Sequence, residues 1–362
     1  MRNIMGGQNK TLIFKDKPIF GLDIGSSTIK VMQLDEVNRK SCKLQAYGVS
    51  KLDHNAIKDG VIEDFDTMAK SVVELFKNNI VGKITTTRVA MTVPSNHTFS
   101  KVLTLPKMKQ SQLAEAVALE SEQYIPMAFA DLYFDYSIIE TRKDDIEVLV
   151  VASPRKIVDS YMTLARMLGL EPIAFETNIG AVARLFEKQD QHNAVPSVLI
   201  DIGSYSSDIT IHDKTMIVTN TIPTGGEMFT DSLVSSMGVT KEEAHIIKTK
   251  YGLGKSKKQK QVVEALKPEL EQLIKEIKRM IRYYEDRGDK KSKIGQIVTM
   301  GGGANMLGLS EHIIDSLRLP VRTCNPWQNI NLNKLQPPSQ MERTMYVTVA
   351  GLALINSKEI FA

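Results

Sequence analysis

The chain has little of what marks secreted, membrane-spanning or nucleic-acid-binding proteins. Only two cysteines occur, Cys42 and Cys324, which is too few for a disulfide framework and gives no metal-binding spacing. The longest apolar stretches, near 146–152 and 346–355, fall short of the ~20 residues that a membrane span needs. Residues 1–17 lack the apolar segment of a secretory signal. Because the net charge of +4 is also too small to indicate nucleic-acid binding, these absences predict a cytosolic protein.

What the chain does contain is one short sequence present twice. Residues 21–30 read GLDIGSSTIK, and residues 200–210 read IDIGSYSSDIT. Each copy places Asp-Ile-Gly and small hydroxyl residues between two apolar runs, which predicts a β-hairpin whose turn points backbone N–H groups at an oxyanion. Two such hairpins facing each other would hold a polyphosphate, with Asp23 and Asp201 placed to bind Mg²⁺, through water. A single Asp-x-Gly turn is common, but chance rarely repeats it in matching strands.

A third glycine-rich element follows later in the chain. Residues 297–300 predict a buried strand, Gly301, Gly302 and Gly303 come next, and an amphipathic helix begins near Leu307. Three glycines allow the backbone to lie flat against a ligand. The alternative is a tight strand-to-helix connection, which needs only one glycine.

In this order the three elements resemble the two phosphate motifs and the adenosine motif of the actin-like ATPase superfamily. The resemblance implies an α/β fold of two lobes, a duplicated ribonuclease-H-like ATPase fold, with ATP and Mg²⁺ as cofactors. The nucleotide-binding residues expected on these grounds lie in the repeated hairpins, in the third element and at two further positions: Asp23, Gly25, Ser26, Ser27, Thr28, Lys30, Gly203, Ser204, Tyr205, Ser206, Gly225, Gly226, Lys248, Gly301, Gly302 and Gly303.

Two acidic residues are candidates for catalysis if ATP is hydrolysed. We expect Asp201 to orient a metal-bound water and Glu176 to assist, with Asp23 acting through the metal shell. Glu176 occupies the acidic position of the superfamily's connecting helix, but a first-turn acid favoured by the helix dipole explains it equally well. Neither of these two acids, Asp201 and Glu176, has a nearby histidine or lysine partner in the motif to make a strong general base, so we expect slow turnover.

Other contacts leave alternatives open. The turn at 224–227 resembles the family's Gly-Gly turn, where free N–H groups of a helix start favour an anion, or it is a simple helix start. Lys248 matches the basic residue that flanks adenine. Related sequences have an acid where His245 stands, and Glu243 is the available substitute. Lys30 either reaches phosphate or is an exposed lysine at the end of a strand.

A small strand–helix–strand–strand block interrupts the first lobe, as in the FtsA and PilM branch of the superfamily. The chain closely resembles the PilM family of type IV pilus assembly proteins, over about 18–355. It is carried by PSNH from Pro94, Leu105-Pro106, ESEQYIP at 120–126, Asp135-Tyr136, EVLVVA at 147–152 and GLEPI at 169–173. The expected organisation is a polar tail (1–17), a first lobe (18–94 and 154–195) with the inserted subdomain (95–153), a second lobe (196–325, with a helical periphery at 222–293) and a closing segment (326–362) that returns to the first lobe.

The resemblance implies an ATP-binding scaffold of pilus or type II secretion-like assembly. Such a protein binds the cytoplasmic N-terminal peptide of a PilN-like bitopic inner-membrane protein through its inserted subdomain, and it reaches the inner face of the cytoplasmic membrane only through that partner. Self-association stays open. An FtsA-like cytoskeletal adaptor is the main alternative, disfavoured because no amphipathic anchor follows the closing helix expected at 342–355. A small-molecule kinase is the third, and no acceptor-binding segment stands out.

A basic segment borders the second lobe. Residues 252–261 carry four lysines, and the following helix has an apolar face from Leu266 to Tyr284 and a basic opposite face. A solvated loop and a core-packing helix explain both, and a lipid-headgroup patch is the minority interpretation.

Overall fold

The computed structural model describes residues 17–38, 41–189, 195–287 and 293–356, so the expected polar tail lies outside the described residues almost entirely. The chain forms two compact units. The first consists of 1–185, 329–336 and 348–362, and the second of 186–328 and 337–347. The division falls inside helix α4 (Asn178–Gln189) rather than between residues 195 and 196, where the boundary of the two lobes was expected.

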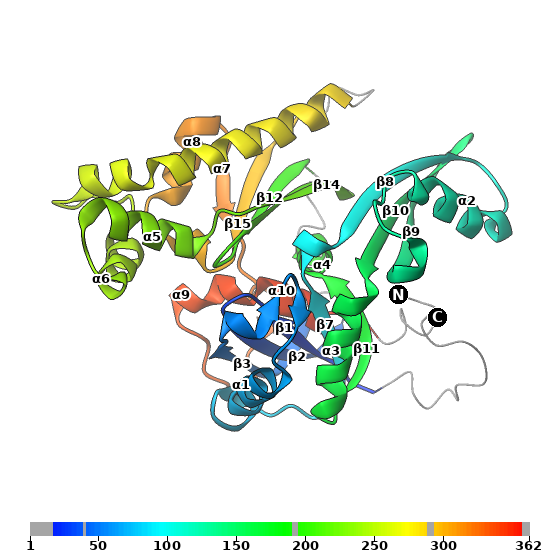
Figure 1. The fold of residues 1–362 in the computed structure, drawn as a ribbon, viewed down its shortest axis with the longest axis horizontal. Helices are drawn as coiled ribbons and strands as arrows, with labels where there is room; N and C mark the ends of the chain where they lie inside the picture. Colours follow the sequence, from blue (N-terminus) through cyan, green and yellow to red (C-terminus); the bar gives the residue numbers. More distant parts are fainter. Residues whose placement is uncertain (1–16, 39–40, 190–194, 288–292, 357–362) are drawn as a thin grey trace. The chain divides into compact units, whose positions relative to one another are not determined.

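A mixed sheet forms the centre of the first unit (Figure 1), in the order β11-β7-β1-β2-β3-β17 with β6 also pairing with β3. Its strands are β1 (Phe20–Ile24), β2 (Thr28–Asn38), β3 (Ser41–Lys51), β6 (Ile80–Gly82), β7 (Arg88–Val93), β11 (Glu171–Thr177) and β17 (Ile330–Asn331). Helices α1 (Phe65–Asn78) and α3 (Arg155–Met167) share a core with Val89 and Met91 of β7. Ala90, which points the other way, packs with α4 and α10 (Val347–Ala353).

Helix α10 approaches its neighbours so closely that glycine is required. A Cβ atom on Gly351 would lie 1.9 Å from the backbone oxygen of Ala181 in α4. A Cβ atom on Gly21 of β1 would lie 2.8 Å from the backbone oxygen of Val349. The single closing helix expected at 342–355 is instead α9 (Gln340–Arg343), a 3₁₀ turn (Thr344–Tyr346) and α10, because Thr344 and Tyr346 are both buried and no single face points inward.

The predicted insertion is a separate layer of the first unit. Strands β8 (Phe99–Pro106), β9 (Leu132–Thr141) and β10 (Asp145–Pro154) form an antiparallel sheet in the order β8-β10-β9, and α2 (Gln110–Glu122) covers one face of it (Figure 1). Leu113 and Val117 of α2 pack against Val148 and Val150 of β10. The insertion therefore has a small core of its own.

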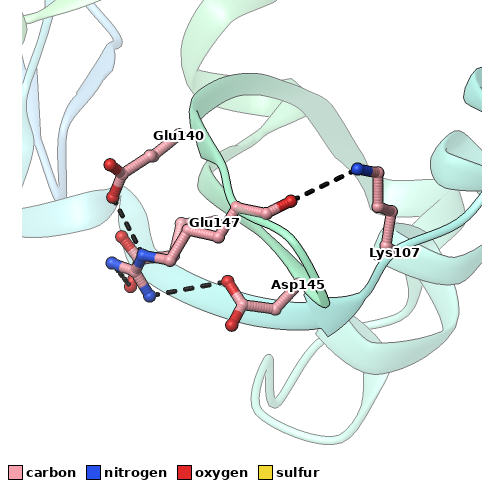
Figure 2. Close-up of polar contacts among 5 residues, drawn as sticks. Lys107, Glu140, Asp145 and Glu147 are labelled. Atoms are coloured by element: carbon pink, nitrogen blue, oxygen red, sulfur yellow. Dashed lines mark hydrogen bonds and ion pairs between the residues drawn. The ribbon is translucent and has the colours of Figure 1, made fainter.

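Charged side chains contact one another around the turn between β9 and β10 (Figure 2). The guanidinium of Arg142 lies 3.0 Å from Glu140, 3.5 Å from Asp145 and 3.0 Å from Glu147. The ammonium of Lys107, after β8, donates to the backbone oxygen of Arg142 at 3.4 Å. One guanidinium thus serves three carboxylates, and this hairpin keeps an acidic surface.

The second unit is built on a five-stranded sheet in the order β14-β13-β12-β15-β16. Its strands are β12 (Ser197–Ile202), β13 (Ser207–Asp213), β14 (Thr215–Ile222), β15 (Gln296–Met300) and β16 (Val321–Thr323), and its main helices are α5 (Gly226–Met237), α6 (Lys241–Ile246), α7 (Gln259–Arg287) and α8 (Leu309–Leu317). The predicted apolar stripe of α7, including Leu266, Leu270 and Ile277, is buried against the sheet and α5. Among the described residues, none of the helices combines the length and hydrophobicity that crossing a bilayer requires.

The close approach of α10 to α4 predicts that Gly351→Ala destabilises the protein. Alanine normally gains about 1 kcal/mol over glycine inside a helix. Here the added methyl group meets a backbone oxygen that cannot rotate away, and we expect a net loss of about 1 to 3 kcal/mol in the free energy of unfolding. Urea unfolding measures it. Gly302→Ala is the matched control, because Gly302 has ordinary helical dihedrals and its Cβ would meet nothing nearer than 3.7 Å. Equal stability of the two variants would contradict the packing argument.

Candidate functional site

The two copies of the repeated sequence fold into hairpins with the same turn. In the β1–β2 hairpin the amide of Gly25 donates to the backbone oxygen of Thr28 at 3.0 Å. In the β12–β13 hairpin the amide of Gly203 donates to the backbone oxygen of Ser206 at 2.9 Å. In both, the aspartate lies two residues before the glycine, at the end of the first strand. The hairpins predicted from the repeat are therefore present, one in each unit.

In the first hairpin the aspartate is neutralised by a lysine. Asp23 and Lys30 face each other across the strand pair, and the ammonium lies 3.1 Å from Oδ2 of Asp23 with both side chains buried. Thr92, at the end of β7, donates to Oδ1 of Asp23 at 3.0 Å. The interpretation of Lys30 as an exposed strand-end lysine is wrong, because its register position opposite Asp23 carries the side chain inward.

In the second hairpin an acid occupies the position of that lysine. Asp208 pairs in register with Asp201, as Lys30 does with Asp23. The hydroxyl of Thr221 donates to Asp208, and desolvation raises the pKa of the Asp208 carboxyl to about 6. Sequence reasoning missed Asp208, although aligning the two copies residue by residue would have placed it opposite Asp201.

The start of α5 lies directly on the second turn. The amides of Gly226 and Glu227 donate to the backbone oxygens of Gly203 (2.9 Å) and Ser204 (2.7 Å). A Cβ atom on Gly225 would lie 2.6 Å from the oxygen of Ser204. The expectation that free N–H groups of this helix start await an anion is therefore wrong for these two amides. The glycines instead allow α5 to brace the turn.

Lys248 reaches the same place from a π-helical turn (Ile247–Tyr251) that follows α6. Its ammonium donates to the backbone oxygen of Gly226 and, at 2.7 Å, to the hydroxyl of Thr230. Burial lowers the pKa of Lys248. Glu243, the expected substitute for a ligand-binding acid, instead caps α6 by accepting from the amide of Thr240 at 2.9 Å, while His245 is exposed.

The three glycines after β15 have different roles. Gly301 has a φ of +81°, and a Cβ atom there would lie 2.3 Å from Oδ1 of Asp201. A Cβ atom on Gly303 would lie 2.2 Å from the side chain of Ile202. Both glycines are thus needed for contact with the end of β12, whereas Gly302 faces open space with only Met345 at 3.7 Å. Gly302 is therefore the position of the three at which a ligand can approach the backbone.

Glu176 is held by an arginine of the following helix. Both carboxylate oxygens accept from the guanidinium of Arg184 in α4, with Oε1 at 2.8 Å from Nη2. Arg184 also reaches the backbone oxygen of Gly351 at 3.4 Å. This ion pair accounts for an acid at 176 without any catalysis, and a catalytic role for Glu176 stays a prediction.

The second unit brings most of the predicted residues into one connected group. Asp201 adjoins Gly301, the turn at 203–206 adjoins the start of α5, and Lys248 adjoins Gly226. Hydroxyls, main-chain groups and an ammonium suit phosphate oxygens, and carboxylates suit Mg²⁺. No group of three or more histidine, cysteine or acidic side chains able to hold a metal occurs within the described residues. The carboxylate of Asp201 would suit Mg²⁺, which would have to take its other ligands from water and phosphate oxygens.

The buried pair in the first hairpin predicts strong coupling between its members. Asp23→Asn and Lys30→Met each leave one buried charge without its partner, so each should cost about 3 kcal/mol in the free energy of unfolding. The double variant should lose less than the sum of the two losses, because no uncompensated charge remains. Chemical denaturation of the four proteins gives the coupling energy. Additive losses would contradict a direct ion pair.

The raised pKa of Asp208 predicts that the free energy of unfolding depends on pH. The folded pKa of about 6 exceeds the usual value of 3.8, so the folded state binds protons more tightly and stability falls as pH rises from about 4 to 6. Asp208→Asn should remove this fall and raise stability at pH 7.5 by about 1 to 2 kcal/mol, a figure reduced for the partial exposure of the side chain. Thermal unfolding across pH tests it, with the exposed Asp144→Asn as control. A variant with the pH profile of the wild type would contradict the assignment.

The chain is similar to known proteins both in sequence and in fold. The family model described as type IV pilus assembly protein PilM matches residues 21–357. The solved PilM-PilN type IV pilus biogenesis complex is similar in fold, with a TM-score of 0.81 and 19% identity over 96% of this chain and 99% of that one.

Two further solved structures share the fold at lower similarity. They are the ethanolamine utilization protein EutJ from Carboxydothermus hydrogenoformans (TM-score 0.53, 17% identity, 94% and 91% of the two chains) and MreB5 of Spiroplasma citri bound to AMPPNP (0.52, 13%, 93% and 95%). The fold is the predicted one, an actin-like ATPase fold of two sheet-containing lobes with a small subdomain inserted in the first. With the family model matching nearly its whole length, the chain belongs to the PilM family of type IV pilus assembly proteins.

Proposed function

We propose that this protein is an ATP-binding scaffold of type IV pilus assembly, in which Mg²⁺-ATP sets a conformation. The observation that carries the proposal is the repeated glycine-closed turn, with an aspartate at the end of its first strand, present in both units. The nucleotide contacts are the main chain and hydroxyls of the turns at 25–28 and 203–206, the open backbone at Gly302, and Lys248. Mg²⁺ would be held through water by Asp23 and Asp201.

Turnover of the nucleotide is expected to be slow. Asp201 is the residue we assign to orienting a water molecule. The residue opposite it in the hairpin is Asp208, another carboxylate, and not a histidine or lysine that would strengthen Asp201 as a base. Glu176 would have to release Arg184 before it could assist. These contacts favour a bound nucleotide that acts as a structural ligand over one that is consumed rapidly.

The proposed partner is the cytoplasmic N-terminal peptide of a PilN-like membrane protein, which would recruit the chain to the inner face of the cytoplasmic membrane. The support is the fold similarity to the PilM-PilN complex and an apolar face on the inserted sheet. Val102 of β8 pairs in register with Leu149 of β10, and both are half-buried on the face opposite α2, together with Val151. An extended apolar peptide would lie on this face or along an edge strand.

The nucleotide proposal is tested at the one open glycine of the third motif. Gly302→Val keeps allowed dihedrals, and its Cβ atom would meet only the side chain of Met345, at an ordinary contact distance of 3.7 Å, so its melting temperature should stay near that of the wild type. Its side chain occupies the space into which a ligand would come, so calorimetry should show Mg²⁺-ATP affinity reduced by tenfold or more, about 1.4 kcal/mol. Asp201→Ala should abolish binding. Wild-type affinity in both variants would contradict the site.

The partner proposal is tested with a synthetic peptide of the partner's cytoplasmic N-terminus. Leu149→Glu places a charge on the proposed face, and fluorescence anisotropy should then show binding weakened by at least tenfold. Ile138→Glu is the matched control, because Ile138 is exposed on β9 and lies on the side of the sheet that α2 covers. Equal losses of peptide affinity in the two variants would contradict binding to this face.

A further inference from the structure

One face of α2 carries an acidic, apolar, acidic pattern. Glu115, Leu119 and Glu122 follow the i, i+4, i+7 spacing that aligns side chains along one side of a helix. All three are exposed, and Leu119 retains 66% of its accessible surface. Tyr124 and Met127, just beyond the helix, are also exposed. Such a face favours a partner surface that carries an apolar side chain between two positive charges.

Helix α7 carries the opposite charges at the same separation of seven residues, again with an apolar residue between them. Lys260, Val263 and Lys267 follow i, i+3 and i+7, and all three are exposed. Neither lysine forms an ion pair with any residue in the described ranges, and the same holds for Glu115 and Glu122. Three more exposed lysines precede the helix, at positions 255, 257 and 258.

The surroundings of the two faces have opposite charge. The insertion at 95–153 contains nine acidic and five basic residues, and residues 255–282 contain nine basic and four acidic ones. Some charges oppose this trend, because Lys101 covers the ring of Tyr124, and Glu264 and Glu271 lie near the lysine face. The excess is nevertheless acidic on one surface and basic on the other.

We propose that the Glu115–Leu119–Glu122 face of one molecule binds the Lys260–Val263–Lys267 face of a second copy. In each face the two charges are seven residues apart, about 10.5 Å along the helix, so both ion pairs can form while Leu119 meets Val263. A contact between two different surfaces leaves one of each free on the resulting pair, so further copies can add. The patches are small compared with the ~800 Å² per partner of stable complexes, so the association should be weak and sensitive to salt.

A second copy fits these observations better than an anionic lipid surface. A membrane would use the lysines alone, and it would leave the acidic face and its exposed Leu119 without a role. The second copy uses both faces, and it accounts for their equal spacing and for the apolar residue inside each charge pair. The scaffold role proposed above is not needed for this inference, since the contact involves none of the nucleotide-binding residues.

Sedimentation velocity of the full chain tests the proposal. At low salt the weight-average sedimentation coefficient of the wild type should rise with protein concentration, and the rise should disappear at about 0.5 M salt, where the Debye length falls to a few ångströms. Glu115→Lys with Glu122→Lys should stay monomeric, as should Lys260→Glu with Lys267→Glu. A mixture of the two double variants should recover association, because the unchanged lysine face of one variant matches the unchanged glutamate face of the other, and the two exchanged faces are also of opposite charge.

Lys58→Glu with Lys77→Glu is the matched control, since it makes the same charge change at exposed positions elsewhere and should self-associate like the wild type. Circular dichroism melting checks that every variant folds. A wild type that is monomeric at every concentration and salt level would overturn the proposal, and so would a mixture that fails to associate. Binding of the wild type to phosphatidylglycerol vesicles, lost in the lysine variant without any self-association, would overturn it in favour of a lipid surface.

Discussion

The turn closed by a glycine amide is the constraint on which both halves of this protein depend. Gly25 and Gly203 each donate to the backbone oxygen three residues later, and a side chain at either position would press on that same oxygen. Because the turn follows the strand-end aspartate directly, its geometry also fixes where Asp23 and Asp201 lie. The neighbouring elements adapt to it: α5 donates its first amides to the second turn, and the glycine at 301 makes room for Asp201.

The two copies keep this backbone and differ in electrostatics. In the first hairpin Lys30 neutralises Asp23, so the pair is stable in the absence of a ligand. In the second hairpin Asp208 replaces the lysine and adds negative charge opposite Asp201. The duplication therefore supplies two similar turns that differ in charge: a lysine neutralises the aspartate of the first, and two aspartates face each other in the second.

Sequence patterns predicted the elements that depend on local residues. The hairpins follow from Asp-Ile-Gly between apolar runs, the insertion from its alternating strands, and α7 from its apolar stripe. Features that depend on distant partners were missed or assigned wrongly. The ion pair of Glu176 joins the end of a strand to the middle of the next helix, and the amides of Gly226 and Glu227 donate to a turn more than twenty residues away. The closing helix was predicted as one piece because its apolar residues are spaced as in a helix, and nothing in that spacing marks the 3₁₀ turn at Thr344–Tyr346.

The central claim is that these turns serve a nucleotide bound together with Mg²⁺. Titration of the wild-type protein with ATP, once with Mg²⁺ and once with EDTA, tests it most directly. The charges of Asp201 and Asp208 would repel a bare polyphosphate, so we predict ATP affinity at least tenfold higher with Mg²⁺, about 1.4 kcal/mol. Equal affinity under the two conditions, or no binding in either, would contradict the account.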